Sequence, residues 1–271
     1  RDRNYKMNQK KINEHYNDEV KEFGSSIKST MPDIFVKKLE IEKISNSIKQ
    51  IKKDHNVENI LEIGCGNGYV LKKISKNIKS DFLGVDVNKK MIELAKKRKR
   101  KELDFKVDDI TNSKLKSEKY DIIFTERCLI NLMSWELQKK AINQIYKLLK
   151  KDGTFIMLEA FTDGLNNLNL ARKALGLKNI EPAWHNNYFV KKRFEKSIKM
   201  KFCFLKTSTT KNNYDNFLSS YYFGSRILYP SLIESKGLSV AYNNKFIEFY
   251  SYIEPVGNYS PLQLCMLKKR N

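Results

Sequence analysis

Apolar residues follow two patterns along the chain: short continuous runs, and longer stretches with apolar side chains at three- and four-residue steps. The runs predict buried strands at residues 59–63, 82–85, 104–107, 120–124 and 154–158. The stretches predict amphipathic helices at residues 32–54, 69–78, 88–100 and 135–150. Strands that alternate with helices in this way are joined by crossover connections and lie parallel. The pattern predicts an α/β fold with a doubly wound, mostly parallel sheet.

After residue 160 this alternation ends. We expect a helix or loop near 165–177, a loop at 184–186, a strand at 198–204, a tyrosine-rich, mostly helical cap at 214–252 and a last strand at 262–267. The last two strands should pair antiparallel at the edge and complete a seven-stranded sheet. We expect one structural domain with three parts: an N-terminal helical segment or lid (1–57), a cofactor-binding core (58–160), and the cap with the antiparallel strands (161–271).

The first strand runs into a glycine-rich turn at residues 62–68, EIGCGNG, and a helix follows the turn. Glycines at such a turn let the backbone approach a ligand closely and leave amide groups free at the start of the helix. Asp86 ends the next strand, where a carboxylate can accept hydrogen bonds from both hydroxyls of a ribose. Asp108 and Asp109 end the third strand, from which a side chain can meet an adenine amino group. All three strand ends should meet at one edge of the sheet, where open α/β sheets bind ligands.

Four segments, taken together, resemble the successive motifs of class I S-adenosylmethionine (SAM) dependent methyltransferases: ILEIGCGNG, LGVDVNKKMIELAKK, KVDDI and YDIIFTERCLINL. They span residues 58–160, approximately. The resemblance implies a Rossmann-like methyltransferase fold, SAM as cofactor and S-adenosylhomocysteine (SAH) as product. A nicotinamide dehydrogenase is the competing interpretation, but its turn is usually Gly-x-Gly-x-x-Gly. The turn here is Glu-x-Gly-x-Gly-x-Gly, which favours the methyltransferase.

The same resemblance implies how the cofactor lies. The glycine turn passes under the methionine and ribose, Asp86 holds the ribose, and Asp109 lies near adenine. The remaining expected cofactor contacts are Glu62, Gly64, Cys65, Gly66, Asn67, Gly68, Val87, Met91, Asp108, Ile110, Thr125, Glu126 and Arg127.

Segments 125–132 and 183–189, together with 29–31 and 257–261, resemble small-molecule methyltransferases found with bacterial surface-polysaccharide genes. This resemblance implies methyl transfer to an oxygen or nitrogen atom of a small, anionic or nucleotide-linked sugar, a glycan precursor or a phosphate-bearing acceptor. The acceptor itself and the need for a general base stay open, since a phosphate oxygen requires none.

His185, in an aromatic-rich loop, is the candidate general base because histidine titrates near neutrality. A structural histidine bonded within that loop is the alternative. Glu126 and Arg127 follow the fourth strand and should point between cofactor and acceptor, where an arginine can clamp a phosphate or carboxylate. Their alternative is an internal ion pair that shapes the loop. The other expected acceptor contacts are Asn131, Tyr188, Tyr222 and Arg226, and the expected lid residues are Tyr16, Thr30 and Met31.

Lys and Arg number 52 against 31 Asp and Glu, a formal charge of +21. This charge, with the basic cluster 96–101, leaves an RNA methyltransferase as the alternative function, although lysines scattered over solvated helix faces explain it as well. The four cysteines lie far apart without metal-ligand spacing, so we expect no metal site. No run of eighteen uncharged apolar residues and no signal-peptide core occur, so we expect a cytoplasmic protein. The oligomeric state stays open.

Overall fold

The computed structural model describes residues 2–29, 31–207, 212–234, 236–237 and 240–270. Within them, seven strands form one sheet in the order β3-β2-β1-β4-β5-β7-β6. The strands are β1 (Asn59–Ile63), β2 (Asp81–Asp86), β3 (Leu103–Val107), β4 (Tyr120–Glu126), β5 (Leu149–Ala160), β6 (Phe202–Phe204) and β7 (Leu262–Lys269). Neighbours among β1 to β5 pair parallel, and β7 pairs antiparallel with both β5 and β6. The predicted seven-stranded, mostly parallel fold is confirmed.

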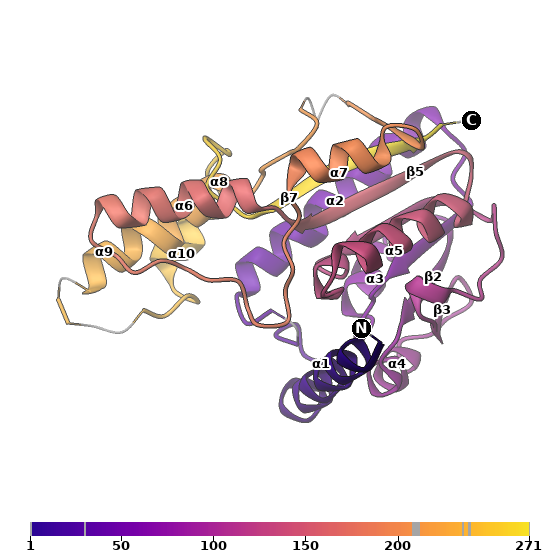
Figure 1. The fold of residues 1–271 in the computed structure, drawn as a ribbon, viewed down its shortest axis with the longest axis horizontal. Coiled ribbons are helices and arrows are strands. Elements are labelled where there is room, and N and C mark those ends of the chain that lie inside the picture. The colour runs from indigo at the N-terminus through magenta and orange to yellow at the C-terminus, as the bar shows by residue number, and fades with distance from the viewer. Residues whose placement is uncertain (1, 30, 208–211, 235, 238–239, 271) are drawn as a thin grey trace.

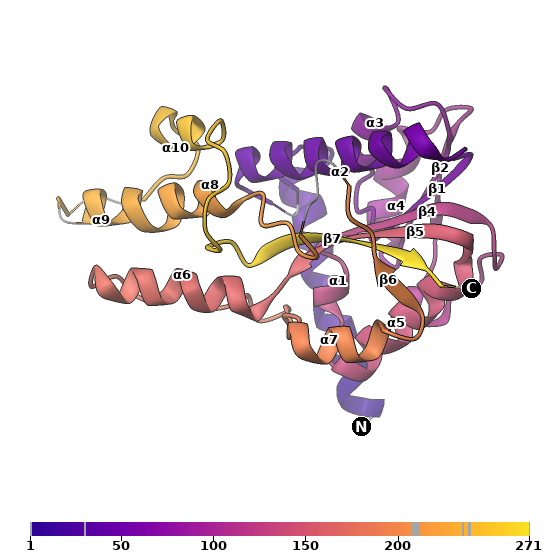
Figure 2. The same ribbon diagram turned by 90° about the horizontal axis from the view of Figure 1, so that it is seen from above.

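Helices cover both faces of the sheet. α2 (Ile34–Asp54) and α3 (Tyr69–Ile74) lie on one face, and α5 (Trp135–Leu148) and α7 (Lys191–Ile198) lie on the other (Figure 2). The core between these layers is apolar, because side chains such as Ile60, Phe124 and Phe155 are fully buried. α1 (Asp2–Phe23) packs beside α4 (Lys89–Lys96), outside the two layers (Figure 1).

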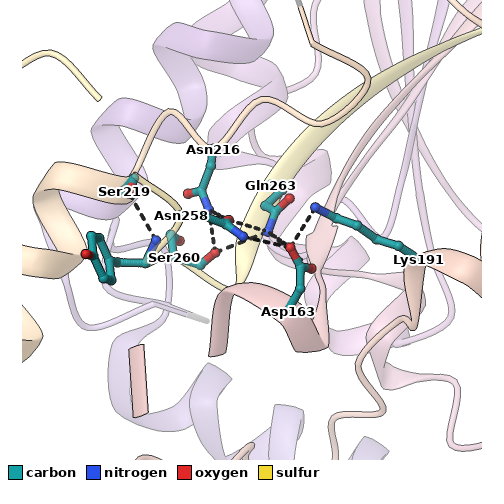
Figure 3. A network of polar contacts seen from close by, with 8 residues as sticks. Asp163, Lys191, Asn216, Ser219, Asn258, Ser260 and Gln263 are labelled. Carbon is teal, nitrogen blue, oxygen red and sulfur yellow. Dashed lines mark hydrogen bonds and ion pairs between the residues drawn. The ribbon is translucent and has the colours of Figure 1, made fainter. Parts of the chain in front are cut away.

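The remaining helices form an arm that projects from the sheet (Figures 1 and 2). The arm consists of α6 (Thr162–Ala174), α8 (Ser219–Phe223), a wider π-helical turn (Gly224–Leu228), α9 (Tyr229–Glu234) and α10 (Lys245–Tyr250). A polar network closes its base, where the chain crosses between arm and sheet (Figure 3). Asp163 accepts hydrogen bonds from Lys191 (2.7 Å) and Asn258 (2.9 Å), and Asn216 donates one to the carbonyl of Ser260 (2.9 Å). These contacts tie the start of α6 to the segments on both sides of α8 to α10.

The predicted strand at 198–204 is wrong over its first half. Ile198 ends α7, and only Phe202–Phe204 is extended. Phe194 and Ile198, four residues apart, are both buried on one side of the helix, whereas Met200 is 78% exposed. The spacing of four therefore prevails over the alternation of apolar and polar residues that predicted a strand.

Three predicted boundaries also differ. α3 ends at Ile74 and α4 at Lys96, four residues before the predicted ends, and β5 begins at Leu149. Residues 151–153, expected to end a helix, therefore belong to the strand, where Asp152 takes a positive φ of 59°. Such a turn-like residue inside a strand marks a local irregularity, and the pairing register between β4 and β5 shifts here.

Candidate active site

A pocket lies at the carboxyl ends of β1 to β4, and the glycine turn forms one wall. Gly64 and Gly66 have φ values of +77° and +50°, which favour glycine. A Cβ atom at Gly64 would collide with the Cys128 side chain. The sequence therefore places glycine where the backbone must turn left-handed against a neighbouring loop.

Asp86 fixes the glycine turn from the end of β2. Its Oδ2 accepts a hydrogen bond from the N–H of Gly66 (2.9 Å), and its Oδ1 accepts one from the N–H of Asn88 (2.8 Å). Burial raises the pKa of Asp86, and these two N–H donors oppose the rise. Each carboxylate oxygen keeps a second lone pair, so both can also accept a ribose hydroxyl.

Three buried oxygen atoms along the pocket wall have no hydrogen-bond donor in the described part of the chain. They are Asn13 Oδ1, Glu62 Oε2 and Asp108 Oδ2. Buried acceptors are costly unless a donor reaches them. SAM carries three kinds of donor, an ammonium group, ribose hydroxyls and an adenine amino group. The residues of this pocket therefore fit SAM.

Beside the glycine turn, four ionisable residues form a buried cluster between α2 and the end of β4. Lys37 Nζ lies 2.7 Å from Glu126 Oε1, and Arg127 bonds both Glu40 (2.9 Å) and Glu126 (3.1 Å). Burial favours a raised pKa for Glu126, but Lys37 and Arg127 outweigh it and lower the pKa to about 2. Burial raises the pKa of Glu40 well above its usual value. Glu126 and Arg127 thus form an internal ion pair as well as lining the pocket.

α1 covers the pocket. Tyr16 from this helix lines it, and its hydroxyl donates to Asn131 Oδ1 (2.5 Å), whose Nδ2 donates to Asn186 (2.7 Å). These two hydrogen bonds join α1 to the loop after β4, and that loop to the loop 183–189, over the pocket. Met31 packs against the apolar core rather than lining the pocket. Thr30 lies outside the described residues.

His185 and Arg226 lie outside the pocket wall. The His185 ring faces His15 of α1, with ring centroids 4.7 Å apart, and its buried Nδ1 has no partner among the described residues. Burial, with His15, lowers the pKa of His185. Arg226 pairs with Asp33 (2.7 Å) and lies over the rings of Tyr222 and Tyr242.

The structure brings most of the predicted cofactor residues to this pocket: Glu62, Gly64, Cys65, Gly66, Asn67, Asp86, Val87, Met91, Asp108, Asp109, Ile110, Glu126 and Arg127. Asn131 and Tyr16 join them. Gly68 and Thr125 do not line it. Gly68 instead packs against Phe105, whose ring a Cβ atom there would approach to 2.7 Å. Tyr188 and Tyr222, expected at the acceptor, also lie outside the wall.

Sequence reasoning missed Lys37, Glu40, Asn13 and Ile12. α2 buries Lys37, Glu40, Ile44, Ile48 and Ile51 on one stripe, so its first half turns a charged face to the interior. The signal was available in the chain, because Lys37 and Glu40 continue the three- and four-residue spacing of the later isoleucines. The apolar residues expected on that face were Ile34, Leu39, Ile41, Ile44, Ile48 and Ile51. The last three are buried, and the first three are only partly buried.

Sheet order, glycine turn and acidic strand ends together are those of class I SAM-dependent methyltransferases, enzymes whose cofactor is SAM. A family model described as a methyltransferase domain matches residues 54–217, so the chain belongs to this family.

Curated relatives resemble parts of the chain. Malonyl-acyl-carrier-protein O-methyltransferase 1 of Ilyobacter polytropus is 29% identical over 153 residues, which cover 54% of this chain and 51% of that protein. Putative methyltransferase 235L of Invertebrate iridescent virus 6 is 33% identical over 106 residues, 38% of each chain. The chain spans between 38% and 53% of the length of the curated relatives it matches.

Solved structures share the fold. The plantazolicin methyltransferase BpumL, in complex with a pentazolic desmethylPZN analog and SAH, is 19% identical with a TM-score of 0.53, and the match covers 88% of this chain and 86% of that one. YcgJ of Bacillus subtilis is 16% identical with a TM-score of 0.51, covering 84% and 99%. Among the described helices, none combines the length and apolar character needed to cross a membrane.

Proposed function

We propose that this chain transfers a methyl group from SAM to an oxygen or nitrogen atom of a small anionic acceptor. The observation that carries the proposal is one pocket that combines the glycine turn, the Asp86 carboxylate and three buried oxygens lacking donors. SAM, when bound, supplies an electrophilic methyl group. The protein's task is to orient the acceptor atom in line with the sulfur–carbon bond, and positioning of this kind can account for most of a rate enhancement.

A small acceptor is supported by the cover over the pocket. α1 contributes Ile12, Asn13 and Tyr16 to the wall, and Tyr16 is fastened through Asn131 to the loop 183–189. A large folded substrate would have to displace α1, whereas a small molecule requires only a local opening.

An anionic acceptor is supported by Arg226. Its buried Nη1 has no hydrogen-bond partner among the described residues, while its Nη2 pairs with Asp33. A guanidinium whose N–H groups are not all hydrogen-bonded within the protein is suited to bind a phosphate or a carboxylate. Arg127, by contrast, is paired with the carboxylates of Glu40 and Glu126. We therefore propose that Arg226, rather than Arg127, binds the anionic group of the acceptor. Tyr188 and Tyr222 are proposed to complete this side.

His185 is proposed as the base where the acceptor is a hydroxyl or a protonated amine. Its unpartnered Nδ1 can accept a proton, and its lowered pKa keeps the ring neutral near pH 7. Glu126 is unsuited to this role because its pKa of about 2 makes it a weak base.

We further propose a nucleotide-linked sugar, glycan precursor or phosphate-bearing molecule as acceptor. The resemblance of segments 125–132 and 183–189 to methyltransferases of surface-polysaccharide genes supports this class. Two relatives are named malonyl-acyl-carrier-protein O-methyltransferases, which agrees with transfer to oxygen.

RNA methylation is the second candidate because the chain carries a charge of +21. The basic cluster 96–101 weakens it. Arg98 donates to the carbonyls of Asn67 (2.9 Å) and Ser25 (2.8 Å), Arg100 donates to that of Ser75 (2.6 Å), and Lys99 pairs with Asp104 (3.0 Å). Three of the six basic side chains in this cluster therefore bind groups of the protein itself, which leaves them less available to bind RNA phosphates.

A methyl-transfer assay separates the two candidates. Labelled SAM is offered with phosphorylated and nucleotide-activated sugars, and in parallel with bulk RNA, at low and physiological salt. We expect transfer to a small acceptor with mild salt dependence, and a loss of acceptor use but not of SAM affinity in Arg226→Ala. Strong incorporation into RNA that falls steeply with salt and is unchanged in Arg226→Ala would overturn the small-molecule proposal.

A further inference from the structure

One buried carboxylate, that of Glu159 in β5, has no part in the proposed reaction but holds the loop beside the glycine turn. Glu159 is fully buried. Its Oε1 accepts hydrogen bonds from the backbone N–H groups of Cys128 (3.1 Å) and Leu129 (2.9 Å), and its Oε2 accepts one from Ile130 (3.2 Å). A single side chain thus binds three consecutive amides.

These amides belong to the loop 127–132, which supplies Arg127, Cys128, Asn131 and Leu132 to the pocket wall. Arg127 has a φ of +51°, a conformation that is unfavourable for a residue with a side chain. Such a backbone persists only where its surroundings fix it. The loop also fastens the cover, because Asn131 accepts the hydrogen bond from Tyr16. The position of this loop therefore affects both the pocket and its closure.

Two further contacts to residues 128–130 use carbonyl groups. Gln138 donates to the carbonyl of Leu129 (3.3 Å), and the N–H of Asn187 donates to that of Ile130 (2.7 Å). Neither can replace Glu159, which accepts from the N–H groups. Among the described residues, the three amides thus depend on the two oxygens of one carboxylate.

Besides these amides, the Thr125 hydroxyl stabilises the charge of Glu159. In the described part of the chain, no Lys, Arg or His side chain forms an ion pair with it. The titratable groups that face it are the thiols of Cys128, in the loop, and Cys265, in β7, while Lys191 of α7 acts on Cys265. Burial raises the pKa of both thiols, so they stay neutral. Burial also raises the pKa of Glu159, to about 7, against the opposing effect of the three N–H donors.

We propose that Glu159 is the positioning residue of the loop 127–132, and that gain of a proton by its carboxyl releases the loop and weakens the cofactor pocket. The ionised form accepts all three N–H groups. The protonated form is neutral, so the three N–H groups lose the charge that strengthens their hydrogen bonds. Because these N–H donors lower the pKa of Glu159 only while the loop is held, release of the loop leaves a buried carboxyl with a still higher pKa, and proton uptake favours the released state. The pocket is then held above neutral pH and loosened below it.

Amide exchange in the cofactor-free protein tests the proposal without reference to the reaction. We expect the protection factors of the 128–130 amides to fall about tenfold or more from about pH 8 to about pH 6, and to be low at both pH values in Glu159→Gln. The amide of Arg127 is the internal control, because it donates to the carbonyl of Leu158 (2.9 Å) instead. Equal protection of 128–130 at both pH values in the wild type overturns the proposal, and this outcome does not require the variant to fold.

Titration with SAH extends the test to the pocket, and only this part rests on the proposed function. We expect wild-type affinity for SAH to decrease on acidification by at most about tenfold per pH unit, as for one linked proton, and this slope to vanish in Glu159→Gln. His15→Gln is the control for the imidazole of α1 at the cover, and it should keep the slope. A slope that survives in Glu159→Gln but is lost in His15→Gln overturns the role of Glu159 while leaving the methyltransferase intact. A wild-type protein that never binds SAH instead contradicts the proposed function.

Discussion

Gly66 combines two constraints at one residue. Its φ of +50° lies in the left-handed region, and its N–H is bound by Asp86 at the centre of the pocket wall. A side chain here has to bear the backbone strain and also extend from a wall that the cofactor must approach.

We therefore predict that Gly66→Val nearly abolishes SAH binding, measured by calorimetry, while the circular dichroism spectrum is unchanged. Gly176→Val is the matched control, because Gly176 has a φ of +71° with open space around its Cβ position. Both variants should lose about 1–2 kcal/mol of stability from left-handed strain. Only the first should lose binding, and equal SAH affinity in the two would contradict the assignment of the glycine turn.

Lys37, one of two charged residues on the buried stripe of α2, stabilises the pocket wall. It pairs with Glu126 at 2.7 Å, and both side chains are at most 5% exposed. Loss of the Lys37 ammonium group would leave Arg127 as the one cationic partner of Glu126 among the described residues.

We predict that Lys37→Met destabilises the protein by about 3–5 kcal/mol in urea at neutral pH, the cost of stranding a buried ion. The folded-state pKa of Glu126, about 2, lies below its ordinary value of 4.5. The ion pair therefore contributes fully above about pH 4.5 and is lost as pH falls through about 2, so the difference between variant and wild type should shrink over that interval. Lys245→Met, which breaks an exposed pair with Glu248, should leave the stability nearly unchanged at any pH. A pH-independent effect of Lys37→Met would contradict this interpretation.

At the scale of helices and strands, periodicity predicted the elements that are buried on regular faces. The predicted ends of β1 and α2 lie within two residues of the observed ends. This agreement arises because an apolar run or stripe is stable only when it is buried. The predicted strand 198–204 was wrong over its first half because Ile198 fits both periods, two with Met200 and four with Phe194, and only tertiary packing decides between them. The spacing of Lys37 and Glu40 continues the buried stripe of α2, but their partners, Glu126 and Arg127, lie at the end of β4 and just after it, outside the helix sequence.

Helix α6 meets the sheet through a close backbone contact. A Cβ atom at Gly164 would overlap the carbonyl of Ser260, next to the polar network at the base of the arm (Figure 3). Neither side of this contact is a flexible side chain, so the helix must shift if the space is filled.

Gly164→Ala is thus predicted to destabilise the protein by about 1–3 kcal/mol and to speed proteolysis within the arm. Asn166→Ala, on the exposed side of the same helix, should be nearly neutral. Thermal unfolding and limited proteolysis measure both. A Gly164→Ala protein as stable as the wild type would show that the arm base is not packed as described.

The helix α1 acts as a cover through few polar bonds, of which Tyr16 to Asn131 is one. Tyr16→Phe removes the bond and keeps the ring, so SAH should dissociate about 5- to 10-fold faster in stopped-flow experiments, equivalent to about 1 kcal/mol. Tyr146→Phe loses a comparable bond to the carbonyl of Arg270 far from the pocket and should leave dissociation unchanged. Identical rates in both variants would mean that α1 does not retain the cofactor.

At the scale of the whole molecule, strand order decides where chemistry can gather. The order 3-2-1-4-5-7-6 brings the carboxyl ends of β1, β2, β3 and β4 to one edge, and this could be predicted because alternating strands and helices allow few arrangements. The cofactor side of the site follows from these strand ends. The proposed acceptor side does not, because Arg226, Tyr222 and His185 come from the arm and from a loop, whose positions depend on contacts between distant segments. The structure places the His185 ring against His15, and its role as the base stays a prediction.

Calorimetric titration of SAH shows whether the pocket between the glycine turn and Asp86 holds the cofactor. We expect one molecule of SAH per chain, bound about 10- to 100-fold more weakly by Asp86→Ala, which corresponds to the loss of about 1–3 kcal/mol of charge-assisted hydrogen bonding. Asp81→Ala, at the exposed start of the same strand, should bind as the wild type does. Failure of the wild type to bind SAH, or an affinity unchanged in Asp86→Ala, would contradict this assignment of the cofactor pocket.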